Sequence, residues 1–241
     1  MINESITTIY LSQAPVSVFV PAHEEGETLP VIYMTYGQSL FDDNEQGWHT
    51  REAVRAEREC SGKAAIIVGV HTKIDGSTTP QNICSDSQRA FDDFLMNTIM
   101  PTVERQFPVK SGRENTALCG SSSGGVQCLY TALSHPEAFG AAGVFSPTLT
   151  QYDFDELTGW FFQTVTDEPP YLYLYTGAGD ETEQEIFQYV EQTYDMLMAC
   201  YPPHLLNEVV LPEEKHNEAA WSMIFKDFLH TFLSLREIMD N

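Results

Sequence analysis

A short stretch rich in glycine and serine, Gly120 to Gly125, contains the strongest chemical signal in the chain. Within it Gly120, Ser122 and Gly124 match the G-x-S-x-G pattern, whose central serine is a nucleophile. Glycines flank such a serine because the strand-to-helix turn is too tight for side chains, and the strained turn projects the hydroxyl outward. A strand-like segment precedes the pattern and a helix-like segment follows it. We therefore interpret Ser122 as a nucleophile; the alternative is a glycine-rich structural turn.

A serine hydroxyl is a weak nucleophile at neutral pH, so a histidine must accept its proton. In sites built around this pattern, the catalytic residues follow along the chain in the order serine, acid, histidine. Three of the seven histidines lie late enough in the chain to come after such an acid. His204 precedes the predicted strand Leu206 to Leu211, and His230 lies within a predicted helix beside its apolar stripe. His216 follows the strand directly, at the end of a parallel sheet where functional loops converge. The sequence therefore predicts His216 as the general base.

A carboxylate must hold that histidine in the correct tautomer. Asp180 follows the predicted strand Tyr171 to Gly177, separated from it only by the small residues Ala178 and Gly179. This position favours Asp180 as the acid. The same aspartate could instead cap the following helix, and Glu181 or Glu183 could then be the acid.

A tetrahedral intermediate also requires two backbone N–H groups that point at its oxyanion. The residue after the nucleophile, Ser123, is expected to supply one of them. The other is expected from Gln38, in the loop after the third strand, where Gly37 permits a sharp turn. An ordinary turn at the end of a strand is the alternative interpretation of this loop.

The elements that must position these residues are visible as periodic segments. β-Branched and aromatic runs predict eight strands: Ile6 to Leu11, Val16 to Val20, Val31 to Tyr36, Ala64 to Val70, Thr116 to Gly120, Ala141 to Phe145, Tyr171 to Gly177 and Leu206 to Leu211. Apolar residues at spacings of three and four predict helices: Arg51 to Cys60, Gln88 to Phe107, Ser123 to Ser134, Glu181 to Cys200 and Ala219 to Met239. We expect antiparallel pairing among the first three strands and a largely parallel sheet thereafter. This alternation predicts a largely parallel sheet of about eight strands with helices on both faces, and together with the serine turn before a helix it indicates an α/β-hydrolase fold.

The 241 residues contain no internal repeat and no linker, so we expect one domain over residues 1–241. The most irregular segment is 147–170, which combines aromatic and acidic residues after the sixth strand. It is predicted to form a small helical insertion over the C-terminal edge of the sheet and to act as a lid over the substrate.

Composition limits the partners. Acidic residues outnumber basic ones by 35 to 12, for a net charge of −23, which argues against nucleic acid and anionic membrane as partners.

The five cysteines have irregular spacing without a CxxC pair, and no histidine pair has metal-ligand spacing, so we expect neither a metal nor a cofactor. The N-terminal residues lack the features of a signal peptide, and a cytoplasmic location is expected. Nothing in the sequence indicates the oligomeric state.

Several motifs together are similar to the putative esterase family, in the esterase D and enterochelin-esterase-like branch of the α/β-hydrolases. The similar stretches run in order from Val16 to Phe232: Tyr33 to Asp42, Phe91 to Phe107, Gly120 to Gly125, and Glu214 to Glu218 with Trp221. Tyr36 and Ser39 stand where the family often has aspartate and asparagine.

This resemblance implies hydrolysis of small-molecule esters through an acyl-enzyme, on substrates that range from siderophore and carbohydrate acyl esters to S-formylglutathione and aryl esters. An acyltransferase or thioesterase could use the same triad, and a binding module could keep the fold without activity. With Gly37, three residues are candidates for the wall of the substrate pocket, although ordinary packing would also explain them: Trp48, His49 and Trp160.

Overall fold

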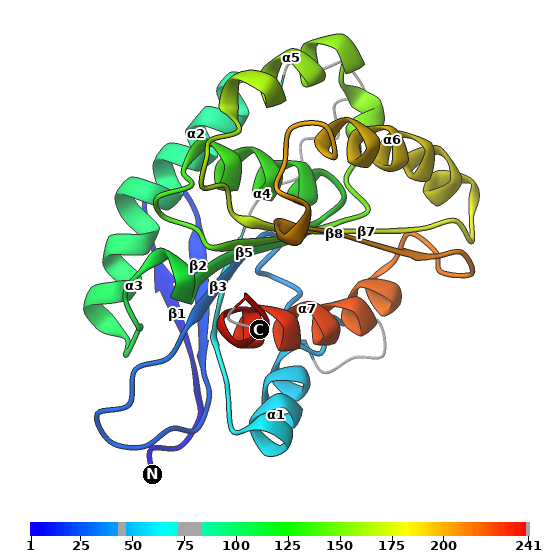
Figure 1. Cartoon of the computed structure of the whole chain (residues 1–241). Coiled ribbons are helices and arrows are strands. Elements are labelled where there is room, and N and C mark those ends of the chain that lie inside the picture. The colour runs from blue at the N-terminus through cyan, green and yellow to red at the C-terminus, as the bar shows by residue number, and fades with distance from the viewer. Residues whose placement is uncertain (43–46, 72–82, 240–241) are drawn as a thin grey trace.

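The computed structural model describes residues 1–42, 47–71 and 83–239 (Figure 1). Its centre is one eight-stranded sheet in the order β1-β2-β4-β3-β5-β6-β7-β8. The strands are β1 (Ser5–Tyr10), β2 (Pro15–Val20), β3 (Val31–Met34), β4 (Ile66–Val70), β5 (Thr116–Ser121), β6 (Ala141–Phe145), β7 (Tyr171–Gly177) and β8 (Leu206–Leu211). The segment from β4 to β8 is parallel throughout, so the predicted α/β fold with a mostly parallel sheet is confirmed.

Helices cover both faces of this sheet (Figure 1). They are α1 (Thr50–Ser61), α2 (Asp86–Phe94), α3 (Met100–Gln106), α4 (Ser122–Ser134), α5 (Phe154–Thr164), α6 (Glu181–Leu197) and α7 (Glu218–Met239). Short 3-10 turns precede β5, α5 and β8. None of these helices, within the described residues, is long and apolar enough to cross a membrane.

The predicted pairing of the first three strands is only partly correct. β1 pairs antiparallel with β2, but β2 pairs with β4, and β3 lies between β4 and β5 in parallel with both. All four residues of β3 are buried, which is typical of an interior strand with helices on both faces. Short spacing along the chain therefore did not determine which strands are neighbours.

The helix predicted over Gln88 to Phe107 is interrupted in the structure. A π-helical turn, Leu95–Ile99, separates α2 from α3. Pro101 lies at the start of α3, and a proline cannot donate a backbone hydrogen bond and crowds the carbonyl four residues earlier. A wider turn just before the proline relieves that crowding.

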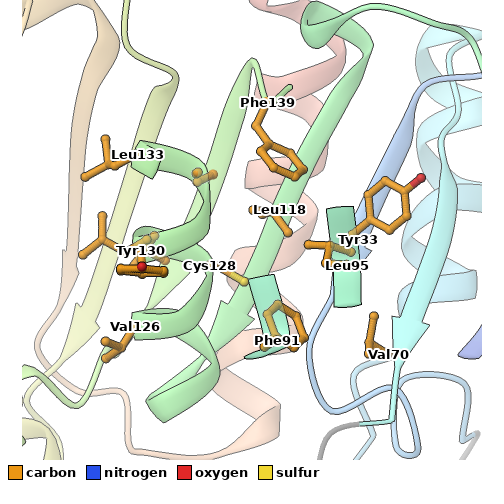
Figure 2. Packing of buried hydrophobic residues seen from close by; sticks show 14 of the residues in the cluster. Tyr33, Val70, Phe91, Leu95, Leu118, Val126, Cys128, Tyr130, Leu133 and Phe139 are labelled. Carbon is orange, nitrogen blue, oxygen red and sulfur yellow. The ribbon is translucent and has the colours of Figure 1, made fainter. Parts of the chain in front are cut away.

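Two hydrophobic clusters hold the helices on the sheet. One lies on the face covered by α2 to α6, and the other lies under α1 and α7. Figure 2 shows part of the first cluster, in which Val126, Cys128 and Tyr130 of α4 lie with Leu118 of β5. Burial of each such aliphatic or aromatic side chain contributes roughly 1.5–3 kcal/mol relative to exposure. This packing fixes α4, and with it the turn at the N-terminus of α4.

Glu208, on the edge strand β8, gives the fold a measurable pH dependence. Burial, together with Glu191 and Asp195 of α6, raises its pKa from the usual 4.5 to about 7. The folded state therefore binds this proton more tightly than the unfolded chain does. The contribution of Glu208 to the free energy of unfolding falls as pH rises from about 4.5 to 7. We expect Glu208→Gln to stabilise the protein by about 1 kcal/mol at pH 8, after discounting for solvent screening, and hardly at all at pH 4.5.

Urea unfolding at the two pH values checks this expectation. The exposed Glu185 of α6 provides a matched control, and Glu185→Gln should have only a small effect on the free energy of unfolding. Equal stabilisation by Glu208→Gln at both pH values would contradict the assignment.

Candidate active site

Ser122 begins α4 directly after β5, at the turn that the sequence predicts. Its backbone φ of +55° lies in the left-handed region that residues other than glycine rarely adopt. Two glycines make the turn possible, because a Cβ atom on Gly120 or Gly124 would lie only 2.5 or 2.2 Å from Thr35 Oγ1. The strained turn exposes the Ser122 side chain to a hollow at the C-terminal edge of the parallel strands.

The His216 imidazole lies beside this hydroxyl, with Nε2 3.1 Å from Ser122 Oγ. His216 belongs to the loop between β8 and α7, as strand direction predicts. Trp221 packs edge-on against the ring, with centroids 5.0 Å apart, and the His216 backbone N–H donates to Asp180 Oδ2 at 3.0 Å. The ring is therefore fixed in a position from which it can accept the hydroxyl proton.

The carboxylate that contacts the imidazole belongs to Glu183, whose Oε1 lies 3.0 Å from His216 Nδ1. The Glu183 side chain is fully buried, and Thr176 Oγ1 and the Gly177 N–H both donate to its Oε2 at 3.0 Å. Burial raises the pKa of this carboxyl, but hydrogen bonds from His216, Ser146 and Gly177 outweigh burial and hold the pKa below its usual value. The anion thus favours the tautomer with a proton on Nδ1, which leaves Nε2 able to accept another.

Asp180 occupies a different position from the one expected of it. It caps α6, and its Oδ1 accepts the Glu183 N–H at 2.9 Å. Its Oδ2 meets the backbone of His216 and not the ring. These two N–H groups, with nearby positive charge, outweigh partial burial and lower the pKa of Asp180, which is consistent with a carboxylate in a cap.

The loop after β7 and the loop after β8 approach each other closely, and this explains why Glu183 contacts the His216 ring. A Cβ atom on Gly177 would lie 2.2 Å from Glu214 O, and one on Gly179 would lie 2.3 Å from Glu213 O. The loop that carries His216 therefore lies against the start of α6, above the third residue of that helix. Asp180 stands at an N-cap position, directly before α6, and this signal could have assigned it to the cap and left Glu183 as the acid.

The expected oxyanion donors line the same hollow as Ser122 and His216. Gln38 follows β3 and Ser123 follows Ser122, and the parallel pairing of β3 with β5 brings both segments to one edge of the sheet. The first N–H groups of a helix have no partner within the helix, so the Ser123 N–H at the start of α4 is suited to an anion. The hollow has a volume of about 340 Å³.

The four predicted pocket residues do not all line this hollow. Trp48 does, and it is 98% buried, with its ring stacked 6.1 Å from that of Phe145. Gly37 instead packs against the backbone of β4, and His49 precedes α1, with its Nδ1 2.7 Å from Glu52 Oε2. The residues that sequence reasoning did not place in the pocket are Tyr36, Ser39, Ser121, Glu218 and Trp221.

Trp160 lies in α5, inside the segment 147–170 predicted as a lid. Its ring stacks on Tyr130 of α4, with centroids 5.5 Å apart, and its neighbours Leu157 and Phe161 are buried. Within the described residues no member of this segment lines the hollow. In the structure, α5 lies on the same side of the sheet as α4 and α6 and packs against α6 (Figure 1).

The profile of one protein family, described as "Putative esterase", matches residues 10–160. The chain belongs to the putative esterase family. The matched region contains the loop after β3 and the turn at Ser122, and the match confirms the resemblance indicated by the sequence motifs.

Two relatives illustrate this family resemblance. The endo-1,4-beta-xylanase/feruloyl esterase of Xylanibacter ruminicola is 24% identical over 174 residues, which cover 66% of this chain and 21% of that protein. The siderophore triacetylfusarinine C esterase of Aspergillus fumigatus is 29% identical over 137 residues, which cover 50% of this chain and 44% of that protein. The match therefore spans less than half the length of either relative.

The crystal structure of an enterochelin esterase from Shigella flexneri has the same fold. It superposes with a TM-score of 0.74 at 16% identity, covering 96% of this chain and 58% of that one. The likeness extends through β7, β8 and α7, beyond the region that the family profile matches.

Proposed function

We propose that this member of the putative esterase family hydrolyses carboxylic esters of small molecules, with Ser122 as nucleophile and His216 as general base. One observation carries the proposal: a single imidazole bridges two oxygens, Ser122 Oγ at 3.1 Å and Glu183 Oε1 at 3.0 Å. A hydroxyl, an imidazole and a buried carboxylate in this order are the groups that activate a serine.

The first half of the reaction forms an acyl-enzyme. Ser122 Oγ bonds to the ester carbon while its proton moves to His216 Nε2, and the Glu183 carboxylate stabilises the resulting imidazolium. The N–H groups of Gln38 and Ser123 donate to the oxyanion of the tetrahedral intermediate. When the carbon–oxygen bond of the ester breaks, His216 returns the proton to the departing alcohol.

The second half releases the acid. A water molecule gives a proton to His216 Nε2 and bonds to the acyl carbon, and collapse of the second intermediate restores the Ser122 hydroxyl. Asp180 takes part only indirectly, because it holds the start of α6 and the His216 backbone in register.

The size of the hollow favours a compact ester as the substrate. A volume of about 340 Å³ is at the lower end for small-molecule sites, and two tryptophans, Trp48 and Trp221, contribute apolar surface to it. The names of the relatives supply feruloyl and siderophore esters as the first substrates to examine.

Labelling with a fluorophosphonate probe tests the proposed nucleophile directly. We expect one adduct per chain by intact mass, mapped by peptide sequencing to Ser122 and not to its neighbours Ser121 and Ser123. The same preparation should hydrolyse p-nitrophenyl butyrate and methyl ferulate. Absence of both labelling and hydrolysis would contradict the proposal, and an adduct on another residue would displace Ser122 as the nucleophile.

A further inference from the structure

Tyr36 bridges the two segments that carry the proposed oxyanion donors. Its side chain starts in the loop after β3, and its hydroxyl lies 2.5 Å from Ser123 Oγ, in the first turn of α4. The Gly124 N–H also hydrogen-bonds the Tyr36 hydroxyl. The ring reaches this position because Gly124 has no side chain: a Cβ atom there would lie 2.9 Å from Tyr36 Cε2.

The first turn of α4 has little other support. Ser121 precedes the helix, but its side chain makes no capping hydrogen bond, and its Oγ is buried without a partner among the described residues. Pairing between β3 and β5 ends near Thr35, whose N–H donates to Cys119 O at 3.3 Å. The contact from Tyr36 to the helix start lies beyond the end of this pairing, and it serves as a cap supplied by another segment.

The other end of Tyr36 orders the loop that contains Gln38. The Tyr36 carbonyl accepts the Ser39 N–H at 3.1 Å and the Ser39 hydroxyl at 3.2 Å. Its backbone φ of +57° is left-handed, which turns the chain sharply just before Gln38. One residue thus contacts both the Gln38 turn and the Ser123 turn.

We propose that Tyr36 is a positioning residue that fixes the spacing between the Gln38 and Ser123 N–H groups, and so strengthens their contact with the oxyanion. The inference rests on the ester hydrolysis proposed above. Donors that are already aligned need no reorganisation as the negative charge develops, so a fixed spacing acts in the transition state and not in substrate binding. Burial raises the pKa of Tyr36, so the hydroxyl keeps its proton and the contact persists at neutral pH.

The test is a double-mutant cycle with a matched control. Tyr36→Phe removes the hydroxyl and keeps the ring, and Ser123→Ala removes the partner hydroxyl and keeps the backbone N–H. We expect Tyr36→Phe to lower kcat for p-nitrophenyl butyrate by about tenfold with KM within about twofold of wild type. The double variant should be no slower than Tyr36→Phe alone, because Tyr36→Phe already removes the contact that Ser123→Ala removes.

Tyr33→Phe is the control, since Tyr33 lies in β3 just before the loop that contains Tyr36 (Figure 2), and its buried hydroxyl has no partner among the described residues. It should leave kcat unchanged. An unchanged kcat in Tyr36→Phe, additive losses in the double variant, or a change confined to KM would each overturn the inference.

Amide hydrogen exchange separates this inference from the proposed function. Exchange in a peptide that covers residues 120–126 should be several-fold faster in Tyr36→Phe than in wild type or Tyr33→Phe, whether or not the protein is active. A wild-type protein without hydrolysis would refute the proposed function, and with it the catalytic consequence of the contact. Unchanged exchange in Tyr36→Phe would refute the contact itself, whatever the activity.

Discussion

Replacement of Ser122 by alanine should lower kcat for ester hydrolysis by about 10⁵-fold, and His216→Ala should have an effect of similar size. The reason is the shared step in which the proton leaves Ser122 Oγ for His216 Nε2 across 3.1 Å. Without either group no acyl-enzyme forms, and the remaining rate comes from the oxyanion donors and substrate binding alone. Steady-state kinetics with p-nitrophenyl butyrate, normalised by fluorophosphonate titration of the wild type, measure the loss.

The combination of the two changes gives a sharper test. The double variant should be no slower than either single variant, because the two side chains act as one unit. Ser134→Ala, at the opposite end of α4, and His204→Ala, before β8, should retain wild-type rates. Undiminished hydrolysis by Ser122→Ala would show that another group is the nucleophile.

Much of this arrangement could be predicted because local patterns and strand direction agree. The bounds of β6, β7 and β8 follow from short apolar runs between turn signals. The G-x-S-x-G pattern located the turn after β5, and the direction of β8 separated His216 from His204. Each of these inferences depends only on one segment and on the rule that functional loops gather at one edge of a parallel sheet.

Other features depend on contacts between distant segments, which single-segment patterns do not encode. The insertion of β4 between β2 and β3 is one example, since chain proximity favoured a different pairing. Trp160 is another: an aromatic residue in an irregular segment suggested a pocket wall, yet the ring stacks on Tyr130. Tyr36 was noted only as a departure from the family pattern, because its partner Ser123 is 87 residues away.

The identity of the acid was ambiguous for a similar reason. Asp180 and Glu183 are one helical turn apart and follow the same strand, so both satisfy the order of serine, acid and histidine. The choice depends on where the His216 loop lies against Gly177 and Gly179, and this is a tertiary contact. The structure assigns the imidazole contact to Glu183 and the helix cap to Asp180.

Two conservative variants test this assignment through opposite outcomes. Glu183→Gln should lower kcat by about 10³- to 10⁴-fold with little change in fold, because glutamine has nearly the same shape. Its amide oxygen can still accept from Thr176 and Gly177, which leaves the NH₂ group facing His216 Nδ1. A donor there stabilises the tautomer with the proton on Nε2, and that nitrogen can no longer accept the proton of Ser122.

Asp180→Asn should instead affect stability more than catalysis. Asparagine is a good cap, but its one carbonyl oxygen can replace only one of the two acceptors that now bind the Glu183 and His216 N–H groups. We expect a loss of about 1 kcal/mol in unfolding free energy and a kcat within about tenfold of wild type. Urea unfolding and kinetics on both variants decide between the two carboxylates. If Asp180→Asn lost most of its kcat while Glu183→Gln stayed nearly active, the imidazole would exchange its partner during the reaction. Asp180 would then be the acid.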